Sequence, residues 1–185
     1  MIRIILAGIL GGLAMFFWSA ISHGALDFGV EPLSNEAAVV ANLQANIAEP
    51  GFYFIPGIDM KNSTEAEQAE WTKKYEAGPN AIVIYHPTGK KAFGAERMGT
   101  ELASNILACA FAAFAISFVS AGFVMRAMIG PIFGLVGWLS IVASYWNWYR
   151  FPTKMVETEL IDQLGGWLVA GIVIAIIVKG RRALS

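Results

Sequence analysis

Four long stretches that are almost free of charge constrain this chain more than any other feature of its sequence. They cover residues 4–22, 102–124, 129–146 and 160–178. A helix rises about 1.5 Å per residue, so about 20 apolar residues cross the roughly 30 Å hydrocarbon core of a bilayer. Hydrophobic residues make up 56% of the chain, and its mean hydropathy is +0.56. The sequence therefore predicts a mainly α membrane protein with a bundle of four transmembrane helices.

The charged residues gather between the first two stretches. Residues 23–100 carry six Lys and Arg against ten Asp and Glu, a net charge of −4. We expect transmembrane helix 1 in residues 1–22, an extracytoplasmic α/β cap in residues 23–100, and helices 2–4 with a cytoplasmic tail in residues 101–185. A cleaved signal peptide is the alternative for residues 1–22, for which we expect a retained anchor.

Cations close to the apolar stretches predict the orientation, because Lys and Arg resist translocation more than Asp and Glu do. Arg3 precedes the first stretch, Arg126 falls in the expected turn between the second and third, and Lys179, Arg181 and Arg182 follow the fourth. We therefore expect both termini to be cytoplasmic in a multi-pass protein of a bacterial inner membrane, with residues 23–100 outside.

Aromatic side chains near the ends of the stretches support this orientation, since indole and phenol rings favour the headgroup level. The expected outer-interface belt consists of Trp18, Tyr145, Trp146, Trp148 and Tyr149. Pro152 is expected to end the third helix.

Within residues 23–100, local signals predict two helices and two strands. Ser34 or Asn35 is suited to cap a first helix, and Thr64 with Glu67 forms a capping box for a second. Residues 52–55 and 81–85 are rich in aromatic and β-branched residues and predict short strands. Because two strands alone are marginal, we expect this cap to pack on the membrane, on the outer helix ends or on a partner.

Small residues recur at four-residue spacing in the apolar stretches, a pattern that lets helices approach closely in lipid. The helix-packing candidates are Gly8, Gly12, Gly130, Gly134 and Gly166. This spacing fits either the sealing of this bundle or the docking of a neighbouring protein.

Four residues are candidates for a ligand or metal site on the outer side. His23 and Asp27 share a face if the first helix continues outward, and His86 and Asp59 could join them. The alternative is that His23 simply ends a helix and Asp27 begins a loop. The four lack a recognised ligand spacing.

A second polar group lies near the outer ends of the second and fourth stretches. It consists of Glu101, Asn105, Asp162 and Gln163. These residues either complement helix dipoles at the interface or bind a headgroup, a quinone or an ion.

Cys109 is the single cysteine, lies in an apolar stretch and forms no intramolecular disulfide. We predict no catalytic residue, no cofactor and no nucleic-acid binding.

Three segments, residues 51–57 (GFYFIPG), 80–87 (NAIVIYHP) and 144–152 (SYWNWYRFP), resemble a group of small uncharacterised bacterial inner-membrane proteins. The resemblance implies four helices and an extracytoplasmic insertion after the first. It implies no activity.

Three functions follow as hypotheses. The first is a non-enzymatic accessory, assembly or stabilising subunit of a larger membrane complex, with membrane lipids and either a protein partner or further copies of the chain as its neighbours. The second is a small ligand-, metal- or redox-cofactor-binding protein that uses His23, Asp27 and His86. The third is an oligomeric channel or carrier.

Overall fold

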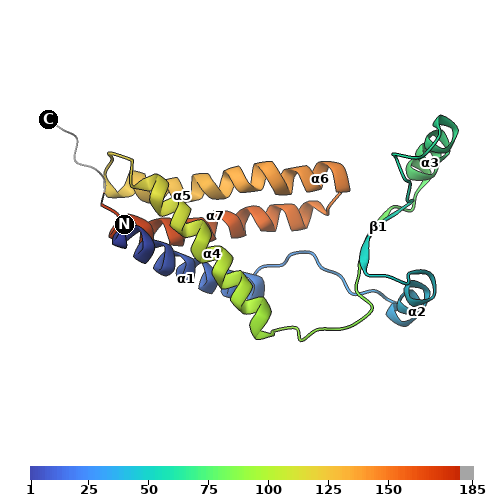
Figure 1. Ribbon diagram of the computed structural model, residues 1–185, viewed down its shortest axis with the longest axis horizontal. Coiled ribbons are helices and arrows are strands. Elements are labelled where there is room, and N and C mark those ends of the chain that lie inside the picture. The colour runs from blue at the N-terminus through green and yellow to red at the C-terminus, as the bar shows by residue number, and fades with distance from the viewer. Residues whose placement is uncertain (180–185) are drawn as a thin grey trace. The chain divides into compact units, whose positions relative to one another are not determined.

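The computed structural model describes residues 1–179 and divides into two compact units (Figure 1). The helical unit comprises residues 1–30 and the chain from residue 92 onward, and the inserted unit comprises residues 31–91. Arg181 and Arg182 of the expected cytoplasmic tail lie outside the described residues. The inserted unit is shorter than the expected 23–100, because the helices on both sides extend beyond their apolar stretches.

Four helical spans in the described chain are long and apolar enough to cross a membrane, as the apolar stretches predict. They are α1 (Ile2–Ala25), α4 (Ala95–Ile116), a continuous span Phe123–Tyr149, and α7 (Thr153–Ile177). The third span consists of α5 (Phe123–Gly137), the π-helical segment η1 (Trp138–Val142) and α6 (Ala143–Tyr149).

The helix ends differ from the predicted ones in two places. The stretch 102–124 is not one helix, because α4 ends at Ile116 and residues 117–122 connect it to α5. Arg126 was expected in this turn but lies in the first turn of α5, where it is buried. At the far end of the span, the chain leaves the helix at Tyr149, and Arg150 takes a left-handed conformation with φ 56° before Pro152 precedes α7.

The spans pack so that α1 lies between α4 and α7, and α7 lies between α1 and α5. The consecutive helices α4 and α5 have only marginal contact, so the order in space is α4, α1, α7, α5. The buried core lies where α1, α4 and α7 meet and contains Ala7, Cys109, Ile116, Ala170 and Ile174. Most other large apolar side chains of the spans are exposed, as expected for surfaces that face lipid.

Glycines of α1 bring its backbone against α4. A Cβ added at Gly8 would lie 2.7 Å from Cβ of Ala110, and one at Gly12 would lie 2.5 Å from Cα of Ile106. Such a close approach leaves no room for a side chain. In α5, an added Cβ at Gly134 would lie 2.8 Å from the carbonyl oxygen of Gln163 in α7.

The inserted unit contains α2 (Glu36–Asn46), β1 (Gly51–Ile55), α3 (Glu65–Ala77) and β2 (Ala81–Tyr85). The strands pair antiparallel, with Gly51 opposite Tyr85 and Ile55 opposite Ala81. The predicted strands and caps are confirmed: the Asn35 side chain accepts from the backbone N–H of Ala38, and Thr64 and Glu67 form the capping box.

The inserted unit has no buried core. None of its residues 31–91, all of which the structure describes, is buried. Neither α2 nor α3 packs extensively on another element of the described chain. The register places Phe52, Phe54, Ile82 and Ile84 on one face of the sheet. On this face Phe52 is 52% exposed and Ile84 is 68% exposed.

Candidate functional site

The most connected polar group in the described chain lies between α1 and α7, close to the end of α1 that leads into the inserted unit. Asp162 of α7 accepts hydrogen bonds from two α1 side chains at the same carboxylate oxygen, Oδ1. The indole Nε1 of Trp18 donates to it at 2.9 Å and also to the Asp162 carbonyl oxygen at 3.1 Å. The hydroxyl of Ser22, which is 1% exposed, is the second donor. We call Trp18, Ser22 and Asp162 the α1–α7 clasp.

Two adjacent glycines make room for the clasp. The Trp18 ring packs directly against Gly165, and an added Cβ at Gly166 would lie 3.2 Å from Cδ1 of the same ring. Asp162 lies one helical turn before Gly166 on α7, which brings its carboxylate to the indole N–H. The Gly166 predicted at a helix contact therefore touches Trp18.

A second set of links joins α7 to the chain just beyond α1. The Thr158 hydroxyl donates to the carbonyl oxygen of Asp27 at 2.8 Å. The Asp27 carboxylate accepts from the backbone N–H of Gly29 at 2.8 Å and lies 3.8 Å from Nζ of Lys154. Asp27 therefore pairs with a lysine of α7.

His23 and Asp27 each have partners of their own in the structure. Because α1 ends at Ala25, Asp27 does not continue the helical face on which His23 lies. Nδ1 of His23 donates to the Ser19 carbonyl oxygen at 3.0 Å, and its ring stacks on Phe28 with centroids 4.7 Å apart. These contacts fit a histidine that ends a helix.

The four residues of the predicted polar group are split in the described chain. Nδ2 of Asn105 donates to Oε1 of Glu101 at 3.2 Å within the exposed first half of α4. Gln163 meets α5 through its backbone at Gly134, and Asp162 faces α1. In the described chain, Glu101 and Asn105 bond to each other, whereas Asp162 bonds to Trp18 and Ser22.

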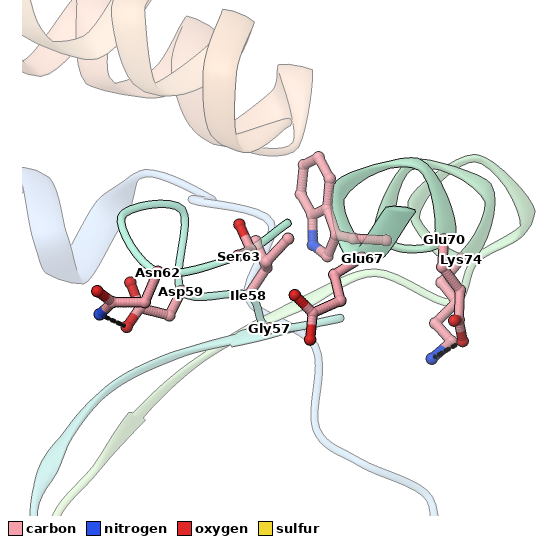
Figure 2. Close-up of a pocket in the computed structure, with 9 residues that line it drawn as sticks. Gly57, Ile58, Asp59, Asn62, Ser63, Glu67, Glu70 and Lys74 are labelled. Carbon is pink, nitrogen blue, oxygen red and sulfur yellow. Dashed lines mark hydrogen bonds and ion pairs between the residues drawn. The ribbon is translucent and has the colours of Figure 1, made fainter. Parts of the chain in front are cut away.

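The inserted unit holds the other two ligand candidates and a shallow groove of about 280 Å³ (Figure 2). His86 is exposed directly after β2. Asp59 lines the groove, where its carboxylate accepts from Nδ2 of Asn62 at 2.6 Å and from the backbone N–H of Lys61 at 3.0 Å. Trp71 also lines it and donates its Nε1 hydrogen to the Pro56 carbonyl oxygen at 3.0 Å.

Every carboxylate that lines the groove already has partners. The hydrogen bond from Asn62 is the main cause that lowers the pKa of Asp59. The backbone N–H of Thr64 lowers the pKa of Glu67, and Lys74, whose Nζ lies 2.8 Å from Oε1 of Glu70, lowers the pKa of Glu70. Figure 2 shows the Asp59–Asn62 and Glu70–Lys74 pairs on separate sides of the groove. The three groups therefore satisfy local donors and do not converge on a common ligand.

Within residues 1–179, no group of three or more His, Cys, Asp and Glu side chains could hold a metal ion. Asp59 and His86 belong to the inserted unit, and His23 and Asp27 belong to the helical unit.

The expected aromatic belt lies on α6, with Trp18 as the exception. Tyr145, Trp146 and Trp148 are 42%, 48% and 72% exposed, and the rings of Tyr145 and Tyr149 lie 5.6 Å apart. Trp18 instead belongs to the clasp between helices.

Sequence reasoning missed the pairing role of Ser22 and Thr158, and the burial of Arg126. Ser22 is the last residue of the first predicted span, and polar residues in spans tend to make interhelical hydrogen bonds. The sequence therefore contained a signal for Ser22 but did not indicate which helix would supply its partner. Thr158 precedes the fourth predicted stretch, so the same signal did not apply to it.

Comparison of the chain with known protein families, with curated proteins and with solved structures found no match.

Proposed function

We propose that this chain is a non-enzymatic, four-span membrane protein that serves as an accessory, assembly or stabilising subunit of a larger membrane complex. In this proposal, both termini are cytoplasmic, the inserted unit forms a cap outside a bacterial inner membrane, and a partner protein packs against this cap.

The observation that carries the proposal is the absence of buried side chains throughout residues 31–91. An isolated two-stranded sheet is at best marginally stable in water. The face formed by Phe52, Phe54, Ile82 and Ile84 consists only of large apolar residues. Exposed apolar patches of this kind mark interaction surfaces. The unit therefore has the composition of one side of an interface.

Charge favours a protein over the lipid surface as the neighbour of this unit. Residues 31–91 contain five lysines and eight Asp and Glu residues, so their net charge is −3. Anionic headgroups attract basic segments and repel acidic ones. A protein surface with apolar and basic groups is the better match.

The ligand- or metal-binding hypothesis has weaker support. His23 and Asp27 have separate partners within the helical unit, and Asp59 is held by Asn62 and Lys61. The polar side chains of the α1–α7 clasp form hydrogen bonds between α1 and α7.

The test is co-purification from native membranes in mild detergent with two matched variants. Ile84→Lys places a charge on the sheet face, and Met60→Lys places the same charge on a residue that is 60% exposed outside the strands. The wild-type chain and Met60→Lys should purify with the same partner at fixed stoichiometry, confirmed by tagging that partner in turn. Ile84→Lys should lose it.

Recovery of the wild-type chain only as a lone monomer would contradict the proposal. If lipid covers the sheet face instead of a protein, the result should differ. Ile84→Lys would then leave complex formation unchanged and would strengthen binding to anionic vesicles.

A further inference from the structure

Arg126 carries a buried positive charge at one end of the helical unit. It lies in the first turn of α5 and is 9% exposed. One terminal nitrogen donates to the Ala121 carbonyl oxygen at 2.5 Å, and the other donates to the Ala175 carbonyl oxygen at 3.0 Å. The guanidinium therefore lies between the α4–α5 connection and the last turn of α7.

The described chain leaves this cation incompletely satisfied. Nε of Arg126 is buried and has no hydrogen-bond partner among the described residues. Its two hydrogen-bond acceptors are carbonyl oxygens, and within residues 1–179 it forms no ion pair with a carboxylate. The last turn of α7 offers only the partial negative charge of a helix C-terminus. A buried charge without a counter-ion is costly, so an anion at this position would be stabilising.

The first turn of α5 supplies further donors at the same place. Its N-cap residue is Gly122, and no side chain caps the helix. The first N–H groups of a helix have no partner within the helix and attract anions together with its dipole. The Arg126 side chain runs back to Ala121, which directly precedes Gly122, so its charge and these N–H groups share one end of α5.

The residues that begin α5 are exposed in the described chain. Phe123, Val124 and Met125 are 46%, 70% and 62% exposed, and they precede Arg126 in the first turn. A span of this length begins near the headgroup level, where phosphate groups lie.

We propose that the first turn of α5 and the Arg126 guanidinium bind a phosphate group at the membrane interface. Backbone N–H groups hold its oxygens, and the guanidinium neutralises its charge. A phospholipid headgroup and free phosphate share this chemistry. The proposal goes beyond the function proposed above. It rests on membrane insertion and is independent of any partner of the inserted unit.

The test is native mass spectrometry of the full-length chain after delipidation in detergent, with defined lipids added back. Wild-type protein should retain one phosphatidylglycerol at low lipid excess and should not retain monogalactosyldiacylglycerol, which has no phosphate. Excess inorganic phosphate distinguishes the sources: displacement of the lipid shows a general phosphate site, whereas retention shows recognition of the whole headgroup. Failure of wild-type protein to prefer the phosphate lipid would overturn the proposal.

Variants locate the site. Arg126→Gln should weaken phosphatidylglycerol binding about tenfold or more, because a charge-assisted hydrogen bond is lost. Arg126→Lys keeps the positive charge but lacks the planar guanidinium and its paired N–H donors. It should therefore weaken phosphatidylglycerol binding less than Arg126→Gln does. Lys179→Gln removes an exposed cation just beyond α7 and should have little effect. If Arg126→Gln does not fold, two measurements still test the proposal. They are phosphatidylglycerol binding to Arg126→Lys and the preference of the wild-type protein for phosphatidylglycerol over monogalactosyldiacylglycerol. Equal loss in the Lys179 variant would mean diffuse attraction and would contradict the assigned site.

Discussion

The indole nitrogen of Trp18 in α1 lies 2.9 Å from Oδ1 of Asp162 in α7, although the two residues are 144 positions apart in the sequence. The same carboxylate oxygen accepts from Ser22, and the Trp18 ring packs on Gly165. Interhelical hydrogen bonds and close packing drive helix association in lipid, where apolar burial contributes little. The clasp therefore accounts for the contact between α1 and α7 near this end of the helices.

Loss of the Trp18 donor should loosen this contact. Trp18→Phe keeps an aromatic ring but removes the N–H, and Asp162→Ala removes the acceptor. A double-mutant cycle on unfolding in detergent should give a coupling of about 0.5–2 kcal/mol, since paired residues are not additive. Trp148→Phe, at a position that is 72% exposed, is the control and should change stability little. Strictly additive effects of Trp18→Phe and Asp162→Ala would show that the hydrogen bond contributes nothing.

Gly12 should tolerate no side chain. Gly12→Ala places a Cβ 2.5 Å from Cα of Ile106, so α1 and α4 must move apart, at a cost of about 1–3 kcal/mol. Gly24→Ala is a matched control in the same helix, because nothing lies within 4 Å of its added Cβ. It should be neutral or slightly stabilising through helix propensity. Thermal unfolding of both variants in one detergent checks this, and equal midpoints would contradict the α1–α4 contact.

The N-terminus of α3 should weaken in acid. The Thr64 backbone N–H and hydroxyl both donate to Oε2 of Glu67 at 2.8 Å, and these bonds lower the pKa of Glu67 below its ordinary value of 4.5. A lowered folded-state pKa contributes stability above the ordinary value, and this contribution is lost as the pH falls through the folded-state pKa. Carbon-13 NMR titration of the Glu67 carboxyl should show the low pKa, and Thr64→Val should raise it.

Glu67→Gln serves as the control for this titration. It retains an acceptor for the capping box but carries no titratable group, so the α3 N-terminus should lose its pH dependence below 4.5. A Glu67 pKa that does not respond to Thr64→Val would show that the side-chain hydrogen bond does not form in solution.

The strands of the inserted unit should exchange their amide hydrogens quickly in the purified chain. Because residues 31–91 have no buried side chain, local opening of β1 and β2 costs little. Hydrogen-exchange mass spectrometry should find these strands much less protected than α1 or α7, and protected once the proposed partner is bound. Strong protection of β1 and β2 in the isolated chain would mean that the unit is stable without a partner.

Local sequence signals predicted local structure well. The capping box of Thr64 and Glu67, the cap at Asn35 and the two strands depend on residues within a few positions of one another. Four helices long enough to cross a membrane followed from apolar length alone.

Features that depend on the rotation of one helix against another could not be predicted in the same way. Their positions near predicted helix ends group Asp162 with Glu101, whereas the Asp162 carboxylate faces Trp18 in the structure. The break between the second and third spans is predicted around Arg126 but lies at residues 117–122, because these residues continue the apolar stretch without a charge. For the same reason, Arg126 was expected in a turn and is instead buried at a helix start.

The orientation of the chain is tested most directly by cysteine labelling. In a Cys109→Ala background, Lys61→Cys places a thiol on an exposed residue of the inserted unit, and Lys179→Cys places one beyond α7. In intact bacterial spheroplasts, a membrane-impermeant maleimide should label Lys61→Cys at once and Lys179→Cys only after permeabilisation. Labelling of Lys61→Cys only after permeabilisation, or of both sites from the same side, would contradict four crossings with an external inserted unit.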